Sequence, residues 1–373
     1  MGFTRRNFLS RLAIGAGSAA VLQVPLAQRI FASPEPQRTL PLAGAIQLGS
    51  NENAYGPLPS AVSAMQDALS RANRYPFVLY GPLVERIAAY HRISPEQVVI
   101  GSGSTEPMRL SAQALVGTGK NVVVADPTFE AMGEFASELR AEIRKVPLSS
   151  SFAHDLDAML KRVDANTAVV YICNPNNPTA SVTPAGDLET FFGKLPAHVT
   201  VVMDEAYHHF ADGMPGYRSF IDRAGDRFIV LRTFSKIYGM AGMRLGYSVS
   251  SAATAKKLSE YSLPISINIV AAAAGMASLD DDVAMKFAAE RNAADRAEFM
   301  AQAAARKLAV IPSSCNFAMV KTGRPAKDLN AAFRARNIIV GRPFPPMLDY
   351  LRVSFGQPAE MKTFWQAWDQ INS

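Results

Sequence analysis

The sequence is poor in cysteine. Cys173 and Cys315 are the only two among 373 residues, and they lie in the largely apolar stretches VVYICN and PSSCNFAMV. Two cysteines exclude a disulfide framework and a cysteine-rich zinc site, and no other metal site is expected. We therefore expect both cysteines to be small buried side chains.

Dense clusters of basic residues are lacking as well. The formal net charge is +6, but four arginines and no acid lie in residues 1–32, so the remainder of the chain carries only +2. A nucleic-acid groove needs a concentrated positive patch, and we expect no nucleic-acid partner. Apolar residues make up 49% of the chain, which is enough for a sizeable core and argues against disorder.

The acid-free start of the chain predicts a targeting signal. Arg5 and Arg6 precede Phe8 and Leu9, and a moderately apolar stretch, too short to span a bilayer comfortably, leads to small residues near Ala32. Residues 1–32 therefore resemble a twin-arginine signal peptide, with an ordinary amphipathic helix as the alternative. We expect a periplasmic or otherwise exported protein, cytoplasmic if the signal is not used. No later stretch predicts stable membrane insertion.

Short apolar segments alternate with helical patterns in the middle of the chain. They cover residues 98–103, 121–127, 168–178, 199–207 and 228–236. Because these segments are solidly apolar rather than alternating, they predict an α/β fold with a mostly parallel sheet covered on both faces. Residues 245–251 are expected to add an edge strand. A long alanine-rich helix over 280–308 then introduces a smaller α+β domain.

Polar side chains and one aromatic ring follow these apolar segments, where ligands bind in parallel sheets. They are Ser104, Thr105, Glu106, Phe129, Asn174 to Pro178, Asp204, Glu205, Tyr207, Ser235 and Lys236. The glycines before Ser104 do not complete a dinucleotide fingerprint, because Glu106 stands where the third glycine belongs. Asp204 and Glu205 follow no phosphate-binding loop upstream, so a nucleotide site is not expected.

Together these residues match the needs of a phosphorylated aldehyde cofactor with a pyridine ring. A lysine in apolar surroundings can bind a carbonyl group covalently when its pKa is lowered. A helix start with hydroxyls and an arginine suits a phosphate. A buried carboxylate suits a protonated ring nitrogen.

The sequence is similar to fold-type I pyridoxal-phosphate aminotransferases, and within them to the histidinol-phosphate aminotransferase family. The matching segments are SNENAYGP, NRYP, GSGSTEPM, DPTFEAM, NPNNPT, DEAY, RTFSKIYGMAGMRLGY and GRPFPPMLDYLRVSFG, in this order between Ser50 and Gly356. The resemblance implies a seven-stranded sheet in a large pyridoxal-phosphate-binding domain over residues 73–275. It places an arm and part of a smaller domain at 33–72, and the rest of that domain at 276–373.

The resemblance also implies roles for individual residues. Lys236 would be the Schiff-base lysine and catalytic base, Asp204 would pair with the pyridine nitrogen, and Tyr207 and Asn177 would bond the ring oxygen. Phe129 would stack on the ring, and Ser104, Thr105, Ser235 and Arg244 would hold the phosphate. Tyr75 would reach the phosphate of a neighbouring subunit, which implies a homodimer. Arg352 would bind the substrate carboxylate, and Asn177 would also contact the substrate.

The implied reaction moves an amino group between an amino acid, or a phosphorylated amino alcohol such as histidinol phosphate, and a 2-oxo acid, by a ping-pong mechanism. A threonine-phosphate-type decarboxylase and an aromatic amino acid aminotransferase are the alternatives on the same scaffold. One position departs from the family, because Ala180 stands where a glycine is usual. If this position needs a positive φ, alanine is costly there, and we expect a small loop shift without loss of catalysis.

Overall fold

The computed structural model describes residues 44–372. The predicted signal peptide over residues 1–32 lies outside the described residues. Over the described range, no helix combines the length and the apolar character needed to cross a membrane.

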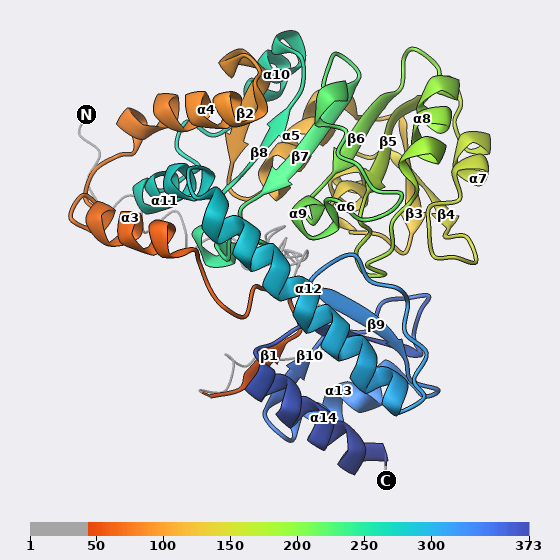
Figure 1. Ribbon diagram of the computed structural model, residues 1–373. Helices are drawn as coiled ribbons and strands as arrows, with labels where there is room; N and C mark the ends of the chain where they lie inside the picture. The colour runs from red at the N-terminus through yellow and green to blue at the C-terminus, as the bar shows by residue number, and fades with distance from the viewer. Residues whose placement is uncertain (1–43, 373) are drawn as a thin grey trace, which may run out of the picture. The chain divides into compact units, whose positions relative to one another are not determined.

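A seven-stranded sheet forms the centre of the larger part of this range (Figure 1). In spatial order its strands are β2 (Val98–Gly101), β8 (Gly246–Val249), β7 (Phe228–Thr233), β6 (Thr200–Asp204), β5 (Thr167–Cys173), β3 (Asn121–Asp126) and β4 (Glu142–Pro147). Every neighbouring pair is parallel except the two pairs that β8 makes with β2 and β7. The predicted α/β fold with a mostly parallel sheet is confirmed.

Two strands differ from the expectation. The prediction that residues 245–251 form an edge strand is wrong, because β8 lies between β2 and β7 and all its residues are buried. Strand β4 is not predicted from the sequence, and it forms one edge of the sheet. Its charged residues Glu142, Arg144 and Lys145 suit an edge, where charge discourages pairing with another chain.

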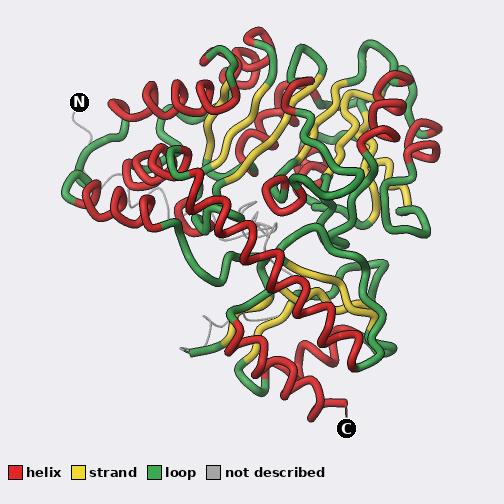
Figure 2. The backbone as a smooth tube through the Cα atoms, viewed as in Figure 1, coloured by secondary structure: helices red, strands yellow, loops and turns green. Residues whose placement is uncertain are grey.

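Helices lie on both faces of the sheet (Figures 1 and 2). The helices between its strands are α5 (Thr105–Leu115), α6 (Ala131–Glu138), α7 (Leu156–Lys161), α8 (Ala185–Lys194) and the short α9 (His208–Ala211), and α10 (Ala252–Ser259) follows β8. Phe191 and Phe192 of α8 share an apolar cluster with Val170 and Ile172 of β5. This packing anchors the strands whose ends carry the predicted site.

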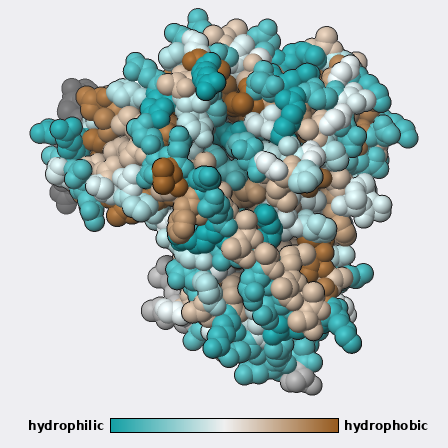
Figure 3. Space-filling view, viewed as in Figure 1, coloured by the Kyte–Doolittle hydropathy of each residue, from teal (hydrophilic) through white to brown (hydrophobic). Residues whose placement is uncertain are grey.

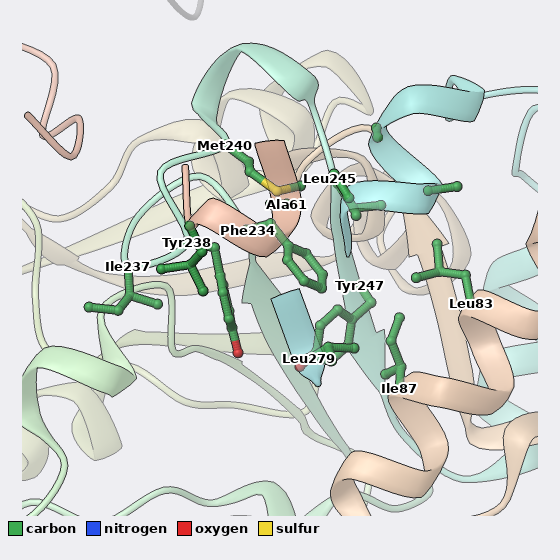
Figure 4. Packing of buried hydrophobic residues seen from close by; sticks show 14 of the residues in the cluster. Ala61, Leu83, Ile87, Phe234, Ile237, Tyr238, Met240, Leu245, Tyr247 and Leu279 are labelled. Atoms are coloured by element: carbon green, nitrogen blue, oxygen red, sulfur yellow. The ribbon is translucent and has the colours of Figure 1, made fainter. Parts of the chain in front are cut away.

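Helices α3 (Pro59–Leu69) and α4 (Phe77–His91) both pack against α11 (Ile269–Leu279). Their apolar cluster includes Phe234, Tyr238 and Tyr247, which Figure 4 shows close together. The ring centroids of Phe234 and Tyr238 are 4.9 Å apart, and those of Phe234 and Tyr247 are 6.0 Å apart. Since Phe234 and Tyr238 flank Lys236 by two residues on each side, their packing fixes the backbone that carries this lysine.

The long helix α12 (Asp282–Ala305) leads to two small sheets (Figure 2). In the first, β1 (Ile46–Leu48) pairs in parallel with β10 (Ile338–Val340); in the second, β9 (Phe317–Lys321) pairs antiparallel with β11 (Tyr350–Ser354). Helices α13 (Ala326–Arg334) and α14 (Pro358–Asn372) complete this part, and its core holds Phe299, Phe333, Phe364, Trp365 and Trp368. The predicted domain boundaries after residues 72 and 275 stay predictions.

Candidate active site

The carboxyl ends of β5, β6 and β7 meet at one edge of the sheet. These strands are parallel neighbours, with Cys173 opposite Asp204 and Asp204 opposite Leu231. The loop that carries Asn177 follows β5, Asp204 ends β6, and Lys236 lies just beyond β7. The topology therefore brings an amide, a carboxylate and an amine to the same edge.

Lys236 is half-buried and extends toward the loop after β1. Its Nζ donates to the backbone oxygens of Asn51 at 3.1 Å and Ser50 at 3.4 Å, and lies 5.5 Å from the centroid of the Tyr207 ring. Withdrawal from water, followed by the positive charge of Arg352, lowers the pKa of Lys236 to about 8. An amine with this pKa can serve as nucleophile and base at mildly alkaline pH.

Asp204 is buried and doubly hydrogen-bonded. The Tyr171 hydroxyl donates to Oδ2 at 2.9 Å, and the Ala206 N–H donates to Oδ1 at 3.0 Å. Burial raises the pKa of Asp204 to about 6, although both hydrogen bonds and the charge of Lys236 oppose the rise. The ionised form of a buried carboxyl group is stabilised by a positively charged partner, such as a protonated ring nitrogen.

The four residues predicted to hold a phosphate gather at the start of α5. Ser104 and Thr105 form this helix start, and Arg244 Nη1 lies 3.4 Å from Ser235 Oγ. A Cβ at Gly103, whose φ is +68°, would lie 2.3 Å from Arg244 Nη2, so glycine is needed for the guanidinium to reach the helix start. Free N–H groups beside a guanidinium form a suitable anion site.

Arg352 of β11 approaches the site from the smaller part of the chain. Its Nη1 donates to Asn177 Oδ1 at 2.7 Å and its Nη2 to the Gly49 oxygen at 2.8 Å. Its Cζ lies 4.4 Å from the ring centroid of Phe344. Among residues 44–372, the buried Nε atom has no hydrogen-bond partner. Burial lowers the pKa of Arg352 to about 10. A buried guanidinium with an unpaired N–H group can bind an anion.

The Asn177 loop contains the departure from the family pattern. Ala180 is fully buried with φ +60°, so alanine occupies a left-handed position that usually favours glycine. Its N–H donates to the Asn176 oxygen at 2.8 Å, and the Asn176 side chain bonds Thr128 and Thr179. Buried hydrogen bonds therefore hold the loop in this conformation despite the alanine.

We expect Ala180→Gly to change the free energy of unfolding by less than about 1 kcal/mol. Relief of the left-handed strain, about 1–2 kcal/mol, is offset by the lost Cβ burial and by greater chain entropy in the unfolded state. Ala180→Val should instead lower the free energy of unfolding by at least about 2 kcal/mol, because a β-branched side chain adds strain and volume. Urea unfolding of both variants measures this, and a valine variant as stable as wild type would contradict the observed backbone conformation.

Two of the predicted site residues remain to be placed, Phe129 and Tyr75. Phe129 is half-buried and follows β3, which adjoins β5 at the same sheet edge. Tyr75 lies between α3 and α4, is 70% exposed, and makes its ring contact with Phe77. Within one chain Tyr75 is therefore not brought together with the other site residues.

Several residues of the site are not singled out by sequence reasoning. Tyr171 lies inside an apolar strand, and nothing in the pattern indicates that its hydroxyl reaches the neighbouring strand. Asn51 belongs to the quoted segment SNENAYGP, which is the one signal that could have indicated it. The ion pair between Arg342 and Glu130 joins a residue after β10 to one beside Phe129, and it follows only from the folded chain.

Comparison with known proteins gives consistent matches. The family model described as aminotransferase class I and II matches residues 43–367. The histidinol-phosphate aminotransferase of Shouchella clausii is 33% identical over 333 residues, which are 88% of this chain and 89% of that protein. An aromatic amino acid aminotransferase of Rhodococcus erythropolis is 35% identical over 333 residues, 88% of this chain and 90% of that protein.

Solved structures agree with this relationship. The structure of histidinol-phosphate aminotransferase from Sinorhizobium meliloti, in complex with pyridoxal 5′-phosphate, has a TM-score of 0.81 and is 28% identical to this chain. The similarity covers 94% of this chain and 97% of the other. With a family model spanning most of its length and relatives above 30% identity, the chain belongs to the class I and II aminotransferases.

Proposed function

We propose that this aminotransferase uses pyridoxal phosphate to move an amino group from an amino acid, or from a phosphorylated amino alcohol such as histidinol phosphate, to a 2-oxo acid in a ping-pong reaction. The observation that carries the proposal is the meeting of three groups at one sheet edge. They are the Lys236 amine with its lowered pKa, the buried Asp204 carboxylate and the Arg352 guanidinium.

The residues present fit this cofactor. Its phosphate would be held by Ser104, Thr105, Ser235 and Arg244, where Gly103 leaves room for the guanidinium. Asp204 would pair with the ring nitrogen. Asn177 Oδ1 accepts from Arg352, so its Nδ2 group is the part that can donate to the ring oxygen alongside Tyr207. Phe129 would lie against the ring.

When bound, the cofactor supplies an aldehyde that takes the donor's amino group and a ring that withdraws electrons from the donor's α-carbon. Lys236 Nζ, once uncharged, accepts the α-proton, and the positive charges of Arg352 and Arg244 favour its uncharged form. Asp204 holds positive charge on the ring nitrogen by staying ionised beside it. Arg352 orients the donor through its anionic group, so that the α-proton faces the lysine.

The surroundings of Arg352 favour donors with an anionic group. A second cation, Arg342, lies with its Cζ 4.4 Å from the Phe344 ring centroid, the same distance as Arg352 Cζ. Arg342 pairs with Glu130, so within the described part of the chain Arg352 is the cation at this ring that has no carboxylate partner. Such a site accepts a carboxylate or a phosphate ester as its anion.

Single half-reactions test the proposed function. Purified protein loaded with cofactor is mixed with one donor at a time, including histidinol phosphate, aromatic amino acids and threonine phosphate, and the aldehyde-to-amine absorbance change is followed. Keto-product formation supports transamination, whereas release of carbon dioxide from threonine phosphate without a keto product would favour the decarboxylase. No absorbance change with any donor would contradict the proposal.

The pKa of Lys236 gives a pH dependence for cofactor uptake. The uncharged amine attacks the aldehyde, so uptake should accelerate about tenfold per pH unit below pH 8 and level off above it. Stopped-flow absorbance on cofactor-free protein measures this rate. A rate that keeps rising toward pH 10.5, as for an ordinary lysine, would contradict the lowered pKa.

An exposed apolar surface supports a homodimer. Tyr75, Phe77 and Val78 are exposed before and at the start of α4, and hydrophobic patches are visible on that side in Figure 3. Tyr80 bonds the backbone of Ile267, which brings the loop with exposed Leu263 alongside. A second copy of the chain would cover this surface and receive Tyr75 near its phosphate site.

Phe77→Asp combined with Val78→Asp is expected to convert the dimer to monomers and to lower turnover with it, because two charges would be buried at the interface. Light scattering after gel filtration measures the mass. Val283→Asp on α12, where Val283 is 83% exposed, is the matched control and should stay dimeric. A wild-type protein that is monomeric at micromolar concentration would contradict the dimer.

We also propose export by the twin-arginine route, on the strength of Arg5-Arg6 and the apolar stretch after them. Cell fractionation of the full chain and of a variant with both arginines changed to lysine tests this. Equal distribution of the two proteins would contradict it.

A further inference from the structure

Asn51 connects the two residues nearest to the proposed chemistry. It lies in the loop after β1, is 1% exposed, and has φ +54°. Its Nδ2 donates to the Tyr207 hydroxyl oxygen at 3.0 Å, and its backbone oxygen accepts from Lys236 Nζ at 3.1 Å. Asparagine tolerates a left-handed backbone better than most residues. This position therefore uses both the backbone tolerance of asparagine and the hydrogen bond of its side-chain amide.

The orientation of the Asn51 amide is fixed by Ser354. The Asn51 N–H donates to Ser354 Oγ at 2.8 Å, and Ser354 Oγ donates to Asn51 Oδ1 at 3.3 Å. Since Oδ1 is occupied as an acceptor from this hydroxyl, Nδ2 is the part of the amide that faces Tyr207. Ser354 is buried and lies two residues after Arg352 on β11.

The consequence concerns the proton of Tyr207. Burial raises the pKa of Tyr207 well above its ordinary value, so the phenol keeps its proton. Because its oxygen already accepts a hydrogen bond from Asn51, this proton is left to be donated elsewhere. An acceptor in the site, such as the ring oxygen of the cofactor, can take it.

We propose that Asn51 is a positioning residue that turns the Tyr207 hydroxyl proton toward the ring oxygen of the cofactor, with Ser354 holding the amide in the orientation this requires. The inference rests on the proposed function. It links β11, the strand that carries Arg352, to Tyr207, the residue that would donate to the cofactor. Movement of β11 would therefore alter the hydrogen bond that Tyr207 makes.

The test uses the loaded enzyme and the absorbance of the bound cofactor as a function of pH. The ring oxygen carries more negative charge after the cofactor loses a proton, so a donor from Tyr207 favours that form. Asn51→Asp replaces the donating amide by an accepting carboxylate, which turns the Tyr207 proton away from the cofactor. The midpoint of the absorbance change should rise by about one pH unit.

Two controls separate this hydrogen bond from the added charge. Asn53→Asp puts a carboxylate into the same loop, at a side chain whose Nδ2 bonds the Ile237 oxygen rather than the Tyr207 hydroxyl. In a Tyr207→Phe background, Asn51→Asp should shift the midpoint no more than Asn53→Asp does. The titratable groups around Tyr207 remain unchanged throughout: Lys236, Arg352, Cys173 and Cys315.

The outcomes are distinct. A shift with Asn51→Asp that is lost in the Tyr207→Phe background supports the inference. Equal shifts in both backgrounds, or a shift no larger than that of Asn53→Asp, would overturn it. If Asn51→Asp does not retain cofactor, Ser354→Ala, which frees the amide to rotate, should shift the midpoint in the same direction, and an unchanged midpoint would overturn the inference. Wild-type protein that takes up no cofactor would contradict the proposed function instead.

Discussion

Replacing Lys236 with alanine is expected to lower kcat by at least about 10⁴-fold for every donor. In its proposed role, Lys236 is the nucleophile that attaches the cofactor and the base that takes the donor's α-proton, and the variant would lose both. The phosphate contacts proposed for Ser235 and Arg244 would remain, so the variant should still bind the cofactor without a covalent bond. Single-turnover absorbance with excess donor measures the loss.

Lys256→Ala is the matched control for this variant. Lys256 lies exposed on α10, away from the carboxyl edge of the sheet, and its removal should leave kcat unchanged. A Lys236→Ala protein that transaminates at the wild-type rate would show that the amine of this residue has no part in the reaction.

Asp204→Asn is expected to lower kcat by about 10³-fold, the second largest effect. The amide is similar in size to the carboxyl group and can keep the hydrogen bond from Tyr171, but it carries no negative charge. The ring nitrogen would then lose its proton, and with it much of the ring's capacity to withdraw electrons. Steady-state kinetics over pH 6–9 measures the loss.

Asp187→Asn, on the exposed face of α8, removes the same charge at a solvent-exposed position and should leave kcat within about twofold of wild type. Asp204→Glu keeps the charge but moves the carboxylate, and its kcat should lie between those of wild type and Asp204→Asn. Equal kcat for Asp204→Asn and wild type would contradict a catalytic role for the carboxylate.

Much of the sheet can be predicted from the sequence because burial on both faces leaves a simple signal. Strands β3, β5, β6 and β7 are continuous apolar segments, and parallel neighbours with helices between them follow from that pattern. Asp204 and Lys236 directly follow two of these segments, so their place at one sheet edge also follows.

Strands β4 and β8 show where the apolar pattern no longer predicts the strands or their positions in the sheet. β4 is charged because it lies at an edge, and its composition is that of a surface segment. β8 reads Gly-Tyr-Ser-Val, which is weakly apolar although every residue is buried. Its place between β2 and β7 depends on long-range pairing, which local sequence does not encode.

The arrangement of the site depends even more than the sheet on contacts between residues that are far apart in sequence. Arg352 and Asn177 bond across 175 positions of sequence, and no spacing joins them, so only resemblance to a family predicts that they act together. The hydrogen bond from Tyr171 to Asp204 depends on the register of two strands. The left-handed backbone of Asn51 and Ala180 is set by the buried groups around each loop.

Covalent attachment of pyridoxal phosphate to Lys236 is the central claim, and borohydride reduction followed by peptide mapping tests it most directly. Purified protein is loaded with the cofactor, reduced, digested and analysed by mass spectrometry. The predicted result is one phosphopyridoxyl group per chain, on the peptide that contains Lys236, and none in Lys236→Ala. A folded protein that takes up no cofactor, or carries the label on another lysine, would contradict the claim.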